Sequence, residues 1–118
     1  MARKNGCEEK MIDRAFVRPG MSAHEIVQKV RESKEVFLTS TAMRDAGQSD
    51  YKNRLRIHDL LTLAPLYNEM GLFSAECHGG ARWHVGIMNR KENPFEEVRL
   101  LRQAMPDVLL QTLVRETS

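Results

Sequence analysis

Cysteine is scarce in this chain of 118 residues, which contains only Cys7 and Cys77. The two stand too far apart in the sequence to form a metal-ligand pair, and we interpret them as reduced thiols. No apolar run approaches the roughly 18 residues that a membrane-spanning helix requires. The first residues also contain no apolar segment typical of a secretory signal. These absences favour a cytoplasmic protein without a membrane span, and they leave the mitochondrial matrix open.

Several functional motifs are absent as well. The sequence has no dinucleotide-binding or Walker glycine loop and no Gly-x-Ser-x-Gly nucleophile motif. Positive and negative charges are nearly balanced, because the chain has 18 Lys and Arg and 16 Asp and Glu, for a net charge of +2. The excess lies in residues 1–20 and is too weak to indicate a nucleic-acid partner.

The composition that remains is that of a folded domain, with 42% hydrophobic and 29% charged residues. The length suffices for one small domain with a core. Residues 1–20 have no clean period and end in Arg18-Pro19-Gly20, a loop signal. We therefore predict a basic N-terminal extension or linker over residues 1–20 and the folded part over residues 21–118.

Hydrophobic periodicity and end signals predict the elements of the folded part. Ser22 and Glu25 form a capping box before a helix, and Asn93 and Pro94 begin another helix, in which Glu96 completes a capping box. The apolar stripe of this later helix is predicted from Phe95, Val98, Leu101 and Met105. The expected order is a helix over 23–33, a strand over 36–42, a polar loop over 43–52, a helix over 54–70, a strand over 72–77, a turn over 78–81, a helical turn near 85–88, a helix from 93 to 105 and a strand over 108–114.

This order, a helix followed by β-α-β-α-β, predicts a parallel sheet with right-handed crossovers in an α/β fold. The last strand is nearly all apolar, as in strands that are covered on both faces. Three strands fall short of a complete doubly wound sheet and of an eight-stranded barrel. We therefore expect the opening portion of a larger fold.

Residues suited to binding follow each predicted strand. In a parallel sheet the carboxyl ends of the strands meet at one edge, where α/β proteins keep their chemistry. The residues in question are Arg44, Asp45 and Gln48 after the first strand, Gly79 and Gly80 after the second, and Arg115 after the third.

Each of these residue types has a chemical use at such an edge. Asp45 is a possible ligand for a divalent metal, and Arg44 and Arg115 suit a carboxylate through charge-assisted hydrogen bonds. Gln48 can donate to a carbonyl or enolate oxygen, and Gly80 lets a ligand approach the backbone closely. An Asp-Arg pair in a loop is also compatible with a plain surface ion pair.

Four segments carry a resemblance to a known family, with order and spacing that agree throughout. They are residues 38–49 (LTSTAMRDAGQS), 56–61 (RIHDLL), 73–81 (FSAECHGGA) and 100–106 (LLRQAMP), continuing to 113–115 (LVR). Residues 20–115 resemble the first part of the carboxyltransferase domain of pyruvate carboxylase, and they are similar to the α subunit of oxaloacetate decarboxylase. The resemblance implies a partial TIM barrel of the metallolyase group, with three parallel strands and their crossover helices.

The resemblance also implies a function and roles for particular residues. Biotin-dependent carboxyl transfer on pyruvate or oxaloacetate would pass through a metal-stabilised enolate. Asp45 matches a ligand of a divalent metal (Zn, Mn or Co), while Arg44, Gln48 and Arg115 match pyruvate-binding positions and Gly80 lies in the pocket wall. Biotin would arrive on a carrier domain or subunit.

The same resemblance implies an incomplete site, because the other metal ligands and the proton-transferring threonine come from later strands. We expect the isolated chain to be inactive and to expose strand edges, through which the rest of a barrel or a second copy would bind. The chain also departs from the family, which usually has Asp, His, Trp and Gly in place of Ser40, Gly47, His78 and Glu116. Two alternatives stay open: another metallolyase acting on acyl-coenzyme A or 2-oxo acids, and a non-catalytic assembly piece or gene remnant.

Overall fold

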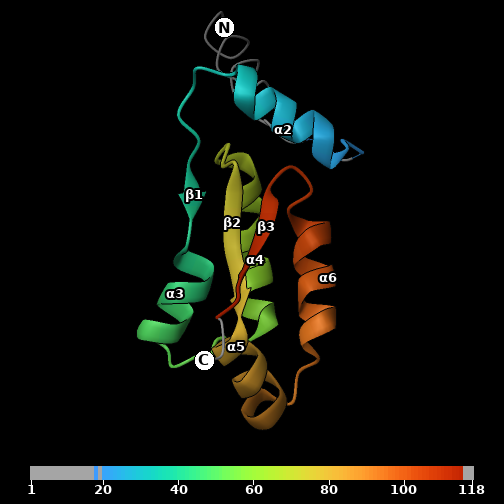
Figure 1. Cartoon of the computed structure of the whole chain (residues 1–118). Coiled ribbons are helices and arrows are strands. Elements are labelled where there is room, and N and C mark those ends of the chain that lie inside the picture. Colours follow the sequence, from blue (N-terminus) through green and yellow to red (C-terminus); the bar gives the residue numbers. More distant parts are fainter. Residues whose placement is uncertain (1–17, 19, 116–118) are drawn as a thin grey trace, which may run out of the picture.

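The computed structural model describes residue 18 and residues 20–115, so most of the predicted N-terminal extension lies outside the described residues. Helices and strands alternate along the described part of the chain (Figure 1). The elements are α2 (Ala23–Glu32), β1 (Thr39–Ser40), α3 (Ala42–Ser49), α4 (Ile57–Glu69), β2 (Ser74–Gly79), α5 (Gly80–Val85), the π-helix η1 (Gly86–Arg90), α6 (Pro94–Ala104) and β3 (Leu109–Leu113).

The three strands form one parallel sheet in the order β1-β2-β3, with β2 in the centre. Helix α4 leads into β2 and α6 leads into β3, so the α/β class and the β-α-β-α-β order are confirmed. Because the strands are parallel, their carboxyl ends lie together, and α3 and α5 follow at that end of the sheet while α2 lies at the opposite end (Figure 1). This common edge is where the predicted site residues were expected.

End signals in the sequence place two helices as predicted. The Ser22 side chain accepts a hydrogen bond from the Glu25 backbone N–H and the Glu25 carboxylate accepts one from the Ser22 backbone N–H, which is a complete capping box. At α6, the Asn93 side chain accepts from the Phe95 backbone N–H and Pro94 occupies the first helical position. The predicted capping role of Glu96 is not seen, because Glu96 pairs with Arg99 instead.

The core lies between the sheet and the two crossover helices. It consists of Met43 of α3, Leu60 and Ala64 of α4, Leu72, Ala75 and Cys77 in and before β2, Leu101 of α6, and Met105 and Val108 before β3. Burial of such side chains is worth roughly 1.5–3 kcal/mol for each large residue. By contrast, α2 buries no residue and contributes none to this core.

Two predictions around the first strand are wrong. The strand is confined to Thr39 and Ser40, and the apolar residues before it, Val36 and Leu38, are 87% and 64% exposed. Residues 43–52, predicted as a polar loop, contain helix α3. Helix forms there because Met43 and Gly47, one turn apart, turn toward the core.

The region after the second strand also differs from the prediction. His78 and Gly79 belong to β2, and Gly80 begins α5, so residues 78–81 are not a turn. The register between β2 and β3 shifts between Glu76 and His78, leaving Cys77 without a partner on β3. This bulge breaks the alternation of side chains along β2, and His78 contacts α6 rather than the face that Glu76 occupies.

Two further burial predictions fail at the edge of the molecule. Phe95, predicted in the buried stripe of α6, is 73% exposed. Strand β3 is only partly buried and Val114 after it is 82% exposed, so this strand is not covered on both faces. Within residues 18 and 20–115, no helix has the length and apolar character needed to cross a membrane.

Candidate functional site

A cavity of about 500 Å³ opens at the carboxyl ends of β2 and β3, beside α3. It brings together five of the six residues predicted at this edge, namely Arg44, Gln48, Gly79, Gly80 and Arg115. Its complete lining is Arg44, Gln48, Gly79, Gly80, Ala81, Arg82, Trp83, Thr112, Leu113, Val114 and Arg115. Among these described residues are three arginines and no acidic residue, so the wall favours an anion.

Helix α3 places Arg44 and Gln48 on one face, since they lie four residues apart. The Nη1 group of Arg44 donates to Oε1 of Gln48 at 3.4 Å. Because that oxygen is engaged, the amide NH₂ of Gln48 is the part suited to donating to a ligand. Helix α3, which was predicted as a loop, therefore aligns the side chains of Arg44 and Gln48.

Arg44 has an acidic partner that the sequence reasoning missed. Its Nε lies 2.8 Å from Oε2 of Glu76, with only 14% and 12% of the two side chains exposed. Nε of Arg44 and Oε2 of Glu76 form an ion pair, but they are not aligned for a hydrogen bond. A glutamate inside a predicted strand was the available signal, because buried carboxylates require a partner. Glu76 orients Arg44 and offsets part of its positive charge.

The two glycines after the core of β2 have different roles. A Cβ atom at Gly79 would lie 3.2 Å from Cδ of Arg44, so the absence of a side chain there lets Arg44 pack against the strand. A Cβ atom at Gly80 would meet nothing within 4 Å. Gly80 therefore borders open space in the cavity, while Gly79 is the glycine that packing requires.

Asp45 does not lie in the cavity lining, and 56% of its side chain is exposed. Its Oδ1 lies 3.5 Å from Nη1 of Arg44. Among the described residues no group of three or more His, Cys, Asp or Glu side chains is placed to hold a metal ion. One exposed carboxylate does not make a metal site, so the residues present do not fit the metal by themselves.

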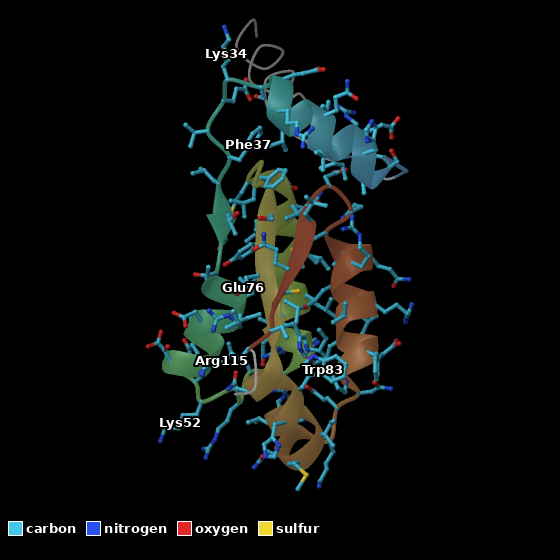
Figure 2. The ribbon with its side chains drawn as sticks, viewed as in Figure 1. Lys34, Phe37, Lys52, Glu76, Trp83 and Arg115 are labelled. Atoms are coloured by element: carbon cyan, nitrogen blue, oxygen red, sulfur yellow. The ribbon has the colours of Figure 1, made fainter. Side chains whose placement is uncertain are left out.

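Arg115 follows β3 and lies at the same end of the sheet as α3 (Figure 2). Arg115, which follows β3, and Arg44, which lies on α3 after β1, therefore line the same cavity although they are far apart in the sequence. Figure 2 also shows Glu76 on β2, on the side of α3. The parallel order of the strands alone accounts for this meeting.

Arg82 and Trp83 of α5 complete the lining and were not predicted. Arg82 is 1% exposed, and burial lowers the pKa of its guanidinium while the nearby Glu97 carboxylate opposes that shift. The Trp83 ring contacts the rings of His78 and Phe95 edge-on, with centroids 5.4 and 4.7 Å apart. No pattern in the sequence indicated α5, because a helix of six residues is too short to show a hydrophobic periodicity.

Behind α5 lies a buried ionic cluster, also missed, which is centred on Glu97 of α6. His78 Nε2 lies 3.0 Å from Oε2 of Glu97, Arg90 Nη2 donates to Oε1 at 2.8 Å, and Arg82 Nε lies 3.4 Å from Oε2. Arg90 also donates to the backbone oxygen of Asn53. Burial raises the pKa of Glu97, but the hydrogen bond with His78 and the two arginines outweigh burial and lower it to about 2. Since Glu97 is then a carboxylate, His78 is the donor.

The parallel sheet with helices between its strands, and the cavity lined by arginines at the strand ends, define part of an α/β domain. Comparison with known proteins gives the family. The chain is 39% identical over 100 residues to pyruvate carboxylase of Bacillus subtilis, which covers 81% of this chain and 8% of that protein. It is 32% identical over 105 residues to the 2-oxoglutarate carboxylase large subunit of Hydrogenobacter thermophilus, covering 80% of this chain and 16% of that protein.

Solved structures agree with the sequences. The carboxyl transferase domain of Rhizobium etli pyruvate carboxylase, with pyruvate and biocytin, matches with a TM-score of 0.69 and 38% identity, over 77% of this chain and 16% of that one. No family profile matches the chain. The chain is therefore related, in sequence and in fold, to a part of the carboxyltransferase domain of pyruvate carboxylases, which confirms the resemblance. It spans less than a fifth of the length of these relatives.

Proposed function

We propose that residues 21–118 form the part of a carboxyltransferase-type barrel that binds a 2-oxo acid, pyruvate or oxaloacetate. The observation that supports this most is that Arg44, Gln48, Gly80 and Arg115 line one cavity at the carboxyl ends of parallel strands. A structure of the related Rhizobium etli domain holds pyruvate and biocytin. Residues 1–20 would be an extension outside this unit.

The chemistry of the lining suits such a ligand. Arg44 and Arg115 would bind the carboxylate, and the amide of Gln48 would donate to the 2-oxo oxygen, where negative charge grows as an enolate forms. Arg44 would bind less strongly than an unpaired arginine, because Glu76 at 2.8 Å already offsets its charge. Its fixed position in return lowers the entropy lost when the ligand binds.

The proposal divides the reaction between this chain and other parts. A divalent metal would polarise the ketone in the assembled site, and Asp45 is the candidate ligand that this chain supplies. Biotin would come from a carrier domain or subunit. Because the described residues present one candidate carboxylate and no further metal ligands in a group, we propose that the chain alone is inactive.

Calorimetric titration of the purified chain with pyruvate tests the binding role. We expect weak binding in the wild-type chain, a loss of about tenfold or more for Arg115→Met, and no change for Arg31→Met, an exposed residue of α2 outside the cavity. Equal affinity in all three proteins would contradict the proposal. Oxaloacetate decarboxylation by the purified chain with metal and no partner would contradict the proposed inactivity.

Exposed apolar residues favour a second role, as an assembly piece that joins the rest of a barrel or a second copy. Val36 and Leu38 before β1 and Val114 after β3 are 87%, 64% and 82% exposed at the two edges of the sheet. Unpaired edges of this kind readily accept another strand. Size-exclusion chromatography with light scattering tests this role. We expect the wild-type chain to show a self-associated species that is absent in Leu38→Lys. A monomer at every protein concentration would contradict self-association.

A further inference from the structure

The π-helix η1 ends in an arginine that contacts the segment after α3. Arg90 is 7% exposed, and its guanidinium binds three groups. Its Nη1 donates to the backbone oxygen of Asn53, its Nη2 donates to Oε1 of Glu97 at 2.8 Å, and its Nε donates to Oε2 of Glu92 at 2.8 Å. The two carboxylates therefore hold the guanidinium in one position against the backbone of Asn53.

The backbone that Arg90 contacts has a conformation that costs free energy. Lys52 and Asn53 have φ angles of 50° and 59°, in the left-handed region that residues other than glycine rarely adopt. Such a conformation persists only where the surrounding structure holds it. Asn53 is 5% exposed, and its carbonyl oxygen accepts from the buried guanidinium of Arg90. Arg90 is therefore placed to keep this loop in its strained form.

Asn53 is also bonded to the helix that carries part of the cavity wall. Its backbone N–H donates to the backbone oxygen of Gly47 at 2.6 Å, in the last turn of α3, where helix carbonyls have no partner within the helix. Gly47 lies between Arg44 and Gln48, which both line the cavity. Only Met43 and Gly47 of the eight residues of α3 are buried. Few side chains thus fix the end of α3, and the bond from Asn53 adds to them.

We propose that Arg90 is a positioning residue of the cavity at the strand ends. Arg90 holds Asn53, Asn53 holds the end of α3, and α3 places Arg44 and Gln48 in the cavity wall. Arg90 itself is not part of the cavity lining. The inference rests on the proposed function for the identity of the ligand, a 2-oxo acid. Without Arg90 the loop leaves the left-handed region, and the Arg44–Gln48 pair loses the fixed position that favours binding.

Gly86→Ala tests the inference while every charged group stays in the chain. A Cβ atom at Gly86 would lie 2.9 Å from Nη2 of Arg90, so the alanine displaces the guanidinium. In calorimetric titration with pyruvate, we expect Gly86→Ala and Arg90→Met to bind about tenfold more weakly than the wild-type chain. Circular dichroism checks that each variant folds, and Gly86→Ala decides if Arg90→Met does not. Equal affinity in folded Gly86→Ala and the wild type overturns the inference.

Arg102→Met is the matched control for these titrations. Arg102 is an arginine of α6 that likewise donates to backbone oxygens, those of Pro106 and Val108. These oxygens precede β3, at the end of the sheet opposite the cavity, and Arg102 is not in the cavity lining. We expect Arg102→Met to bind pyruvate as the wild type does. A loss equal to that of Gly86→Ala would assign the effect to general destabilisation and overturn the inference.

Relief of backbone strain separates positioning from stability. Lys52→Gly makes the left-handed conformation accessible without Arg90, because glycine adopts it freely. Combined with Arg90→Met, it is expected to restore pyruvate affinity several-fold. Lys91→Gly is the control, since Lys91 has a φ of 57° but lies outside the connection between Arg90 and α3. Its combination with Arg90→Met should leave the affinity low. Equal affinities in the two double variants overturn the inference.

A measurement without ligand separates this inference from the proposed function. The side-chain amide resonances of Gln48 report its contact with Arg44 in the free chain. We expect them to shift in Gly86→Ala and to stay in place in Arg102→Met. Unmoved resonances in Gly86→Ala overturn the inference, whether or not pyruvate binds. A wild-type chain that shows this dependence but does not bind pyruvate sustains the placement of α3 by Arg90 and contradicts the proposed function.

Discussion

The two sides of strand β2 each hold a carboxylate beside arginines: an open side, where Arg44 lines the cavity, and a helix side, from which Arg82 also reaches the cavity lining. On the open side Glu76 pairs with Arg44, and their side chains are 12% and 14% exposed. On the helix side Glu97 contacts His78, Arg82 and Arg90, and its side chain is 2% exposed. Glu76 orients Arg44 in the cavity wall, whereas Glu97 joins α5, η1 and α6 behind that wall. The two sets of ion pairs therefore differ in their surroundings, since one borders the cavity and the other is buried between helices.

Removal of the Glu97 charge is expected to have the largest effect on this comparison. Glu97→Gln leaves two buried arginines without their shared carboxylate, and breaking such a pair typically costs about 3–5 kcal/mol of unfolding free energy. Urea denaturation followed by circular dichroism measures the loss. Glu96→Gln is the matched control on the same helix, since Glu96 is exposed and pairs only with exposed Arg99, and its midpoint should equal that of the wild type. Equal midpoints for both variants would show that the cluster does not stabilise the fold.

Acid should weaken the helix side more than the open side. The pKa of Glu97 is about 2 in the folded chain, below its ordinary value of 4.5. The folded state therefore holds fewer protons than the unfolded state between these values. The contribution of Glu97 is present above pH 4.5 and is lost as the pH falls toward 2. Urea midpoints measured from pH 6 down to pH 3 should fall, and the fall should be smaller in Glu97→Gln. Parallel curves for the two proteins would refute this assignment.

A smaller effect is expected on the open side. Glu76→Gln removes the charge beside Arg44 but keeps a side chain that can accept a hydrogen bond, so the loss in unfolding free energy should be about 1–3 kcal/mol. Asp45→Asn serves as the control, because Asp45 is 56% exposed and lies farther from the same guanidinium. Thermal melting of both variants makes the comparison. A greater loss for Asp45→Asn than for Glu76→Gln would reverse our view of which carboxylate holds Arg44.

The sequence predicted the features that depend on neighbouring residues. The Ser22–Glu25 capping box and the Asn93–Pro94 helix start are local and appear as predicted. The β-α-β-α-β order also follows from local periodicity, and with it the meeting of Arg44, Gln48, Gly80 and Arg115 at one cavity. The resemblance to a carboxyltransferase domain, carried by four short segments, is confirmed by relatives at 32–39% identity.

The sequence missed what depends on contacts between distant residues. Helix α3 was predicted as a loop because most of its residues are polar and show no clear apolar periodicity. Its inward face consists of Met43 and Gly47, and their burial is known only from the structure. The length of β1 was overestimated because an apolar segment becomes a strand only where a neighbouring strand pairs with it. Here β2 pairs with Thr39 and Ser40 alone. The bulge at Cys77 could not be anticipated, since it exists only as a mismatch between β2 and β3.

By itself, the sequence of this protein determined the order of its elements and the residue types at the carboxyl edge of the sheet, because both follow from short-range periodicity and parallel topology. Tertiary structure alone decided that Glu76 holds Arg44 and that Arg82 stands in the cavity wall. It also decided that Glu97 gathers three partners that are 7 to 19 residues away. Charges pair according to distance and burial, and both quantities arise only after the chain has folded.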